Sequence, residues 1–398
     1  MKIIQVDIFI LKPGCGTMPP APYKPVIIKL LTDDGVYGYG EAGVALGVGE
    51  RTVFAMTQDL APMLLGKDPF DNEVIWERIR TDLNGHISGG GVVVFSAMSA
   101  FDMAMMDIKA KSLNVPVYKL LGGKFRESLH CYASQLQCGF GDNLRPLGRA
   151  EEYAYICAEA INDGFDTVKI NFVSFDREGK QIPQDAVSGP LNWEIYSLVE
   201  ERLKAIRAEC GENLGIIFEN FCSMNIASAL KMDELTHKYN VLFCEETLLP
   251  MKRDLFAPLA KRIRTPLATG EKIHTRWQFS DLFEDRSVDI IQPDPSNCGG
   301  ISETKKICDM AHIYNIKAQM HLAGSPISTA AAIHLEAAIP NFYIHEYFFL
   351  NRHPDYAAYC TNDYQPVNGV LTVPELPGLG QELSAQAINE AVAHAKIC

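Results

Sequence analysis

Three short runs decide the fold of this chain: GIIFEN (215–220), VLFCEE (241–246) and PLATGE (266–271). Each run is mainly apolar, as expected of a buried strand, and ends at or beside an acidic residue. The acids are Glu219, Glu245 and Glu271, and they lie about 26 residues apart. This spacing is close to one strand–helix unit of a (β/α)₈ barrel. The sequence therefore predicts three neighbouring parallel strands whose acids meet at one rim.

A lone glutamate at a strand end is ordinarily a solvated rim residue, so the prediction depends on three of them being in register. Three carboxylates at one rim would repel each other unless protons or a cation neutralised them. Oxygen-only ligands suit a hard divalent ion, most often Mg²⁺. We expect one Mg²⁺ per active site, at the C-terminal mouth of the barrel where barrel enzymes carry out their chemistry.

The sequence after about residue 126 fits such a barrel. Its strand-like runs are LHCYAS, DTVKIN, GIIFE, VLFCE, PLATG, VDIIQP, IKAQMH and FYIHE. Helical stretches separate them near 150–163, 192–209, 225–238, 252–264, 275–285, 301–314 and 326–338. Strand–helix alternation at this pitch predicts parallel strands joined by crossover helices, and residues 126–350 fit one closed barrel better than a doubly wound sheet.

Residues 1–125 follow another pattern, that of an α+β domain. Three strand-like runs with a turn at Asp33–Gly35 predict a meander, and helical patterns follow around 50–64, 72–84 and 92–112. The Gly- and Pro-rich segment Gly14–Pro22 is a candidate lid. Residues 351–398 lack the period of a barrel helix, and we expect them to return to the N-terminal domain.

Composition narrows the classes of partner. The 398 residues carry a formal net charge of −13 and no basic stripe, which argues against nucleic acid and anionic membrane surfaces. No apolar stretch approaches the length of a membrane span. The 11 cysteines are scattered without a C-x-x-C pair, which favours reduced thiols and a cytoplasmic location.

Several longer segments resemble the enolase superfamily, specifically the mandelate racemase subgroup and its sugar-acid dehydratases such as galactonate dehydratase. The resemblance covers nearly the whole chain, and the order of the segments makes it specific. They are MSAFDMAMMDIKAKSLNVPVYKLLGGK (98–124), ATGEKIHTRWQF (268–279), IIQPDPSNCGGISETKKI (290–307) and NGVLTVPELPGLG (368–380). The resemblance implies an N-terminal capping domain over a modified (β/α)₇β TIM-type barrel, Mg²⁺, and removal of the proton next to a substrate carboxylate.

The resemblance also implies roles for residues at other strand ends. His321 in QMHLAGSP and Asp294 in QPDPSNCGG match the subgroup's His–Asp dyad, in which the aspartate fixes the tautomer of the base. Lys169 matches a charge partner for the substrate carboxylate, and Asn171 a substrate hydrogen-bonding group. Glu346 matches an acid that is protonated and hydrogen-bonds the enolate oxygen.

His345, beside Glu346, is a further substrate-binding candidate. Racemases of the subgroup carry a second lysine where this chain has Asn171, so only one base is expected here.

Two positions depart from the family pattern near the predicted metal site. Glu219 stands where an aspartate is more common. The resemblance implies Glu245 rather than Glu246 as the ligand, because the family ligand is usually the first acid of an E-E-P run, whose proline is Thr247 here. Successive strand residues point to opposite sides, so the two acids are not expected to share the role. Galactonate dehydratase-like sequences place a histidine, the general acid for the leaving hydroxide, where this chain has Phe221. His321 itself, His345 or His86 could replace that acid.

The expected activity is a carbon–oxygen hydro-lyase: a Mg²⁺-dependent dehydratase that converts a small-molecule sugar acid to a 2-keto-3-deoxy acid. Asn171 argues against the alternative of a hydroxy-acid epimerase or racemase. Phe221 motivates a second alternative, a catalytically silent ligand-binding relative. The resemblance further implies a homo-oligomer.

Overall fold

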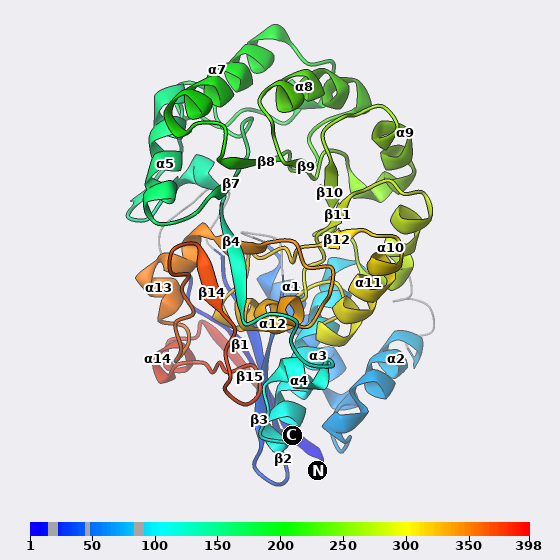
Figure 1. Ribbon diagram of the computed structural model, residues 1–398. Helices are drawn as coiled ribbons and strands as arrows, with labels where there is room; N and C mark the ends of the chain where they lie inside the picture. Colours follow the sequence, from blue (N-terminus) through cyan, green and yellow to red (C-terminus); the bar gives the residue numbers. More distant parts are fainter. Residues whose placement is uncertain (15–22, 44–47, 83–90) are drawn as a thin grey trace.

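The computed structural model describes residues 1–14, 23–43, 48–82 and 91–398. It confirms the expected fold class, a barrel of the TIM type with an N-terminal α+β capping domain (Figure 1). The candidate lid falls almost wholly on residues 15–22, and His86 falls on residues 83–90; both lie outside the described residues.

The capping domain is built on a four-stranded antiparallel sheet with the order β15-β1-β2-β3. Its strands are β1 (Ile3–Ile10), β2 (Val26–Thr32), β3 (Tyr37–Ala42) and β15 (Ala393–Ile397). The first three form the predicted meander, and β15 joins it from the other end of the chain, with Val6 opposite Ile397. The domain's helices are α1 (Glu50–Leu60), α2 (Asn72–Asp82), α3 (Val92–Ser112) and α4 (Val117–Leu120).

Helix α3 packs directly on β3. Its sequence is apolar or small on nearly every side, as expected of a helix buried all round. Gly38 and Gly40 permit the close approach, because a Cβ at either position would lie only 2.2 or 2.0 Å from a backbone oxygen of α3.

The barrel strands follow each other in chain order around a curled parallel sheet, with β13 returning to pair with β4. They are β4 (Ser128–Ser134), β7 (Thr167–Ile170), β8 (Gly215–Glu219), β9 (Phe243–Glu245), β10 (Leu267–Thr269), β11 (Ile290–Ile291), β12 (Lys317–Ala318) and β13 (His345–Phe348). Two backbone hydrogen bonds close the ring between β12 and the segment before β13: Ala318 donates to Asn341, and Tyr343 donates to Ala318.

Helices surround the barrel and bury its outer face (Figure 1). They are α5 (Ala150–Asn162), α7 (Trp193–Cys210), α8 (Ile226–Lys238), α9 (Phe256–Ala260), α10 (Thr275–Glu284), α11 (Ile301–Ile313) and α12 (Pro326–Ala337). The predicted stretch 252–264 is instead a 3₁₀ turn, Pro250–Leu255, followed by the short α9.

Shorter elements fill the connections between these strands and helices: α6 (Asp185–Ser188), α13 (Pro354–Ala357), α14 (Ala385–Asn389), β5 (Gly139–Phe140), β6 (Asn143–Leu144) and β14 (Val370–Thr372), the last of which pairs with β4.

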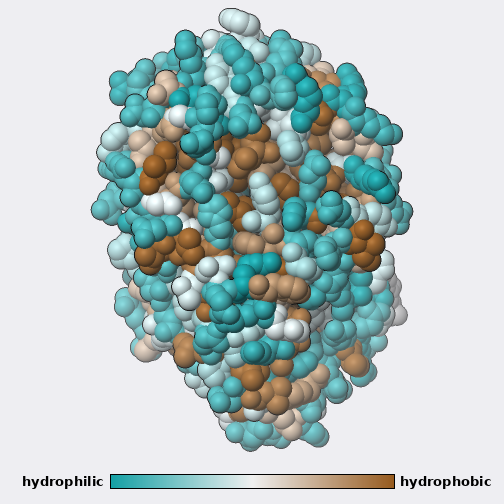
Figure 2. Space-filling model, in the orientation of Figure 1, coloured by the Kyte–Doolittle hydropathy of each residue, from teal (hydrophilic) through white to brown (hydrophobic). Residues whose placement is uncertain are grey.

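The inside of the barrel holds a separate apolar cluster made by alternate residues of the strands. Its members are Tyr132, Ile217, Phe243, Ala268, Ile290 and Ile344. Apolar residues lie in the middle of the barrel region in the space-filling view, within a mostly hydrophilic outline (Figure 2). Parallel strands buried on both faces explain why the sequence of each strand is apolar without strict alternation. The polar residues that break this rule gather around the C-terminal ends of the strands.

Two buried acids of the capping domain hold the barrel helices at their N-termini. Glu41 of β3 accepts hydrogen bonds from the backbone N–H of Ser325 and Ser328 at the start of α12, and from the Tyr23 hydroxyl. Asp102 of α3 accepts hydrogen bonds from the N–H and hydroxyl of Ser302 at the start of α11. A carboxylate at a helix N-terminus satisfies free N–H groups and is favoured by the helix dipole. These contacts fix the capping domain on one side of the barrel.

The described ranges contain no helix with both the length and the apolar character needed to cross a membrane. Every cysteine in those ranges is a free thiol, as the scattered pattern predicted.

Candidate active site

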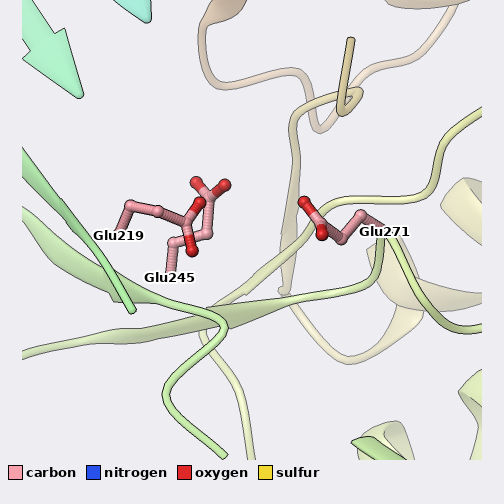
Figure 3. Close-up of side chains that lie close together, drawn as sticks. All are labelled: Glu219, Glu245 and Glu271. Carbon is pink, nitrogen blue, oxygen red and sulfur yellow. The ribbon is translucent and has the colours of Figure 1, made fainter. Parts of the chain in front are cut away.

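The three predicted ligands converge at the C-terminal ends of their strands. Glu219 and Glu245 are the last residues of β8 and β9 and lie opposite each other in the parallel register, while Glu271 follows β10. Each offers a carboxylate oxygen within 4.8 Å of the others. Figure 3 shows the carboxylates of Glu219 and Glu245 side by side and that of Glu271 pointing toward them.

The electrostatics of these three carboxylates, Glu219, Glu245 and Glu271 (the trio), favour a bound cation. Burial and the neighbouring Glu245 raise the pKa of Glu219 well above its ordinary value. Glu219 Oε2 is buried and has no hydrogen-bond partner in the part of the chain that is described. An orphaned carboxylate oxygen beside two other carboxylates is the donor set that a hard divalent cation satisfies. The trio therefore fits a metal site.

Lys169 lies inside the barrel, fully buried beside the trio. Its Nζ is 2.5 Å from Glu245 Oε1, 2.6 Å from Glu346 Oε1 and 3.8 Å from Glu219 Oε2. Burial opposes a charged lysine, but Glu245, Glu346 and Glu219 outweigh it and raise the pKa of Lys169 above its ordinary value. The ammonium is therefore charged and neutralises part of the cluster. Its partners in this structure are protein carboxylates, and its proposed contact with a substrate carboxylate stays a prediction.

His321 and Asp294 form the pair that the family pattern implied. His321 Nδ1 lies 2.9 Å from Asp294 Oδ2, and the N–H and hydroxyl of Ser296 hold the other oxygen of Asp294 at 2.8 and 2.6 Å. His321 Nε2 lies 3.0 Å from Glu271 Oε2, so the imidazole faces the trio. Burial alone lowers the pKa of His321, but Glu271 and Asp294 raise it to about 9. One ring nitrogen is thus fixed by an aspartate and the other points at the candidate metal site.

Glu346 completes the cluster from β13. Its oxygens accept hydrogen bonds from the Ser134 hydroxyl at 2.5 Å and from the backbone N–H of Leu322 at 2.9 Å. Burial raises the pKa of Glu346, but Lys169 and His321 outweigh that effect and hold it below its ordinary value. In the absence of substrate the buried ammonium 2.6 Å away favours the charged form of Glu346, and its protonation beside an enolate oxygen stays a prediction.

The two predicted substrate-binding residues lie in different places. Asn171 is buried just beyond β7, two residues from Lys169, and its Oδ1 accepts a hydrogen bond from the N–H of Val173. His345 does not join the cluster. It is adjacent to Glu346 on β13, so its side chain points away from the barrel interior. On the outer side of the strand, its Nδ1 lies 2.5 Å from Glu336 of α12. The prediction that His345 contacts substrate is wrong because neighbouring strand residues face opposite sides.

Glu246 also lies apart from the trio, as its position after Glu245 implied. It is buried, and its oxygens accept hydrogen bonds from the N–H of Gly270 at 3.1 Å, from the Thr269 hydroxyl and from Lys272 Nζ at 3.1 Å. Its carboxylate therefore has a full set of protein partners.

The loop after β8 carries the departure from the family pattern. Phe221 has a left-handed backbone, with φ of 47°, and its side chain is 42% exposed. Its N–H donates a hydrogen bond to Glu219 Oε1 at 2.7 Å, so the loop helps to orient the ligand. A phenyl ring cannot donate a proton, so the general acid must come from another residue.

Sequence reasoning missed several polar residues that contact the cluster. Gln292 donates to Glu245 Oε2 at 2.5 Å, Ser134 donates to Glu346, and Tyr132 lies with its ring 5.6 Å from Lys169 Nζ. Lys272 contacts both Glu271 and Glu246. Gln292 is the first residue of the QPDP run and Lys272 follows Glu271 directly, so both were available as signals. Ser134 and Tyr132 carry no sequence signal of their own.

Comparisons with known proteins agree with this geometry. Residues 10–122 match the family model "Mandelate racemase / muconate lactonizing enzyme, N-terminal domain", and residues 152–387 match "Enolase C-terminal domain-like".

Two relatives carry dehydratase names. A D-xylonate dehydratase from Haloferax volcanii is 31% identical over 94% of this chain and 86% of its own length. A D-galactonate dehydratase from Ralstonia nicotianae is 31% identical over 93% of this chain and 91% of its own length. A crystal structure of a putative dehydratase from Zymomonas mobilis ZM4 is 43% identical, with a TM-score of 0.95, and covers 100% of this chain and 99% of that one.

Proposed function

The chain belongs to the mandelate racemase/muconate lactonizing enzyme family of the enolase superfamily, and from that premise we propose that it is a Mg²⁺-dependent sugar-acid dehydratase. The observation that carries the proposal is the placement of the His321–Asp294 pair against the carboxylate trio. The dehydratase names of the relatives support the same reaction class. The scattered free cysteines favour a cytoplasmic setting.

Glu219, Glu245 and Glu271 would hold the Mg²⁺. When bound, the ion supplies positive charge for the substrate carboxylate and for the negative charge that develops on it as the α-proton leaves. A cation held by Glu271 would withdraw negative charge from this carboxylate and weaken its interaction with His321 Nε2, which now lies 3.0 Å from Oε2. The imidazole would then be freer to act as a base.

His321 takes the proton from C2 of the acid. Asp294 accepts the hydrogen bond of the opposite ring nitrogen, keeps Nε2 free of a proton before the reaction, and stabilises the imidazolium afterwards. Lys169 stays charged and lies between Glu245 and Glu346, so it adds positive charge beside the candidate metal site. These residues supply the base, its orientation and part of the charge stabilisation.

The second step expels the 3-hydroxyl as water and needs one proton. Phe221 cannot provide it, and His345 faces the outside of the barrel. His321 holds the proton removed from C2, so the proposal assigns its return to the leaving hydroxyl to the same imidazole, in a syn elimination. The resulting enol takes up a solvent proton at C3, loses the proton of its 2-hydroxyl to solvent and becomes the 2-keto-3-deoxy acid. No external oxidant or reductant is required.

The alternative of a two-base epimerase is disfavoured by Asn171, whose amide cannot take a proton and lies where racemases of the subgroup carry a second lysine. A catalytically silent role is disfavoured by the intact dyad and trio, which form a connected array of buried charges. Burying so many charges is costly without a function that uses them.

The experiment that tests the proposal is turnover of a sugar-acid library in D₂O with Mg²⁺. A dehydratase gives a 2-keto-3-deoxy product with deuterium at C3, detected by NMR. Deuterium at C2 of recovered substrate would indicate an epimerase. No exchange with any acid would refute enzymatic activity on this class. His321→Asn should abolish exchange, and His237→Asn, at an exposed position of α8, is the matched control.

A further inference from the structure

Side chains as well as backbone groups close the barrel between β12 and β13, the strand that carries Glu346. Backbone N–H groups alternate sides along residues 318–322. Those of Gln319 and His321 point toward the neighbouring strand β11 and donate to Ile291 and Pro293. Those of Ala318, Met320 and Leu322 point to the other side, where, among the described residues, only Ala318 donates to a backbone acceptor, Asn341. The sheet ladder therefore ends at Ala318 on this side.

Two side-chain carboxylates replace the missing backbone acceptors. The N–H of Met320 donates to Glu336 Oε1 at 3.1 Å, and the N–H of Leu322 donates to Glu346 Oε2 at 2.9 Å. His321 lies between these two bonds. The position of the candidate base thus depends on carboxylates from α12 and β13 rather than on a continuous ladder.

The second oxygen of Glu336 reaches across to β13. Glu336 Oε2 lies 2.5 Å from His345 Nδ1, and both side chains are fully buried. His345 is the residue before Glu346, which contacts Lys169 and Ser134 on the opposite side of the strand. One carboxylate on α12 therefore joins the backbone beside His321 to the residue beside Glu346.

We infer that Glu336 and His345 form a side-chain clamp that closes the barrel and positions His321 against Glu346. The inference rests on the proposed function of those two residues. Neither clamp residue faces the barrel interior, so both are positioning residues rather than catalytic ones. The clamp also gives His345 a role that its sequence position beside Glu346 did not suggest.

The clamp matters because both of its bonds are buried. Replacement of Glu336 by leucine leaves the N–H of Met320 and the imidazole of His345 without their partners, so the segment that carries His321 loses its fixed distance from β13. Misplacement of a catalytic group by about 1 Å can reduce a rate about 100-fold. The expected effect is therefore on the chemical step.

The test compares Glu336→Leu with a matched control, Asp233→Leu. Asp233 of α8 is also a buried helix carboxylate that accepts backbone N–H groups, those of Arg264 at 3.2 Å and Thr265 at 2.9 Å, but these lie before β10, at the opposite end of the barrel from the site. Glu336→Leu should lower kcat for dehydration about 10- to 100-fold, with KM and Mg²⁺ affinity within about threefold. Asp233→Leu should keep kcat within about threefold at a comparable loss of stability.

Two further variants separate positioning from folding. Glu336→Gln keeps an acceptor for Met320 and should recover most of kcat. His345→Phe breaks only the bond to Glu336 and should give a smaller loss of kcat than Glu336→Leu. Both remain informative if Glu336→Leu fails to fold. Equal kcat values for Glu336→Leu and Asp233→Leu would overturn the inference.

Hydrogen exchange provides a readout that does not depend on turnover. In Glu336→Leu, peptides that contain residues 319–322 should exchange faster than in the wild type, and in Asp233→Leu they should not. Unchanged exchange there would refute the clamp whether or not the wild type is active. A wild type that turns over no sugar acid would refute the proposed function separately, so the two failures are distinguishable.

Discussion

The neighbouring acids Glu245 and Glu246 offer a sharp test of the metal site, because the structure places the first in the candidate site and the second in contact with protein donors. Glu245 belongs to the trio within 4.8 Å of Glu219 and Glu271, whereas Glu246 bonds the N–H of Gly270 and Lys272 Nζ. We compare Glu245→Gln with Glu246→Gln, two substitutions that change one charge each and preserve side-chain shape. They differ only in the side of the strand on which the charge is lost.

For Glu245→Gln the expected change in stability of the metal-free protein is small. At an effective dielectric constant of about 20, the ion pair with Lys169 at 2.5 Å is worth about 7 kcal/mol, and repulsion from each of the two other glutamates at up to 4.8 Å is worth about 3 kcal/mol or more. Loss of the charge removes attraction and repulsion of similar size. We therefore expect a change in unfolding free energy within about 2 kcal/mol.

The effect of Glu245→Gln on cation binding should be large. Even loss of a residue that only orients a ligand costs about 10- to 100-fold in metal affinity, and loss of the ligand itself should cost more than about 100-fold. Glu246→Gln should do the reverse: it lowers stability by about 1–3 kcal/mol because buried donors lose their acceptor, and changes affinity less than about threefold.

The assay combines calorimetric titration of metal-free protein with Mg²⁺ or Mn²⁺ and urea unfolding in the presence of a chelator. The wild type and both variants are measured at the same pH and ionic strength. If Glu246→Gln weakened cation binding more than Glu245→Gln, the assignment of the ligand, and with it the orientation of the strand end, would be wrong.

Three further predictions concern the base, the pH dependence and the domain junction. His321→Asn should reduce α-proton exchange about 10²- to 10⁴-fold while Mg²⁺ affinity stays within about threefold, and near-normal exchange by NMR would remove His321 from the mechanism. In metal-free protein the pKa of His321 is raised to about 9. Its charged form therefore stabilises the fold by up to about 3 kcal/mol below pH 6.5, and this contribution is lost as the pH rises through 9. Urea unfolding at pH 6 and pH 9.5 should show that loss in the wild type and not in His321→Asn; parallel pH profiles would contradict it. Glu41→Gln should destabilise the protein by about 2–4 kcal/mol, because donors of Ser325 and Ser328 lose a buried carboxylate acceptor. A loss of unfolding free energy under about 1 kcal/mol in urea unfolding would show that the junction between the domains depends on other contacts.

Much of the fold was predictable because each element follows a local pattern. The predicted helix 92–112 has the observed bounds of α3. Strands β8 and β9 end at Glu219 and Glu245, as their runs predicted, and β10 ends at Thr269, two residues before Glu271. Convergence of Glu219, Glu245 and Glu271 followed from their spacing alone, since equal steps through one repeat reach the same rim of a barrel.

What the sequence did not reveal depends on the side to which a residue points and on contacts between distant segments. His345 looked like a site residue because it is adjacent to Glu346, but adjacency in a strand places it on the other face. Glu41 and Asp102 are acids in apolar surroundings of the capping domain, and nothing local indicates that helices about 200 or more residues later supply their donors. The 2.6 Å contact between Glu346 and Lys169 joins the second and eighth strands of the barrel, so neither local sequence indicates it.

The pairing of β15 with β1 has a practical consequence for dissecting the protein. A fragment ending near residue 125 would lack residues 393–397, so those backbone N–H and C=O groups of Val6–Ile10 that face β15 would lose their partners and leave a mainly apolar strand edge. Such an edge invites association with other chains. A soluble, isolated cap would therefore need residues 393–397 grafted on through a linker, and swapping caps between relatives would have to exchange both segments together.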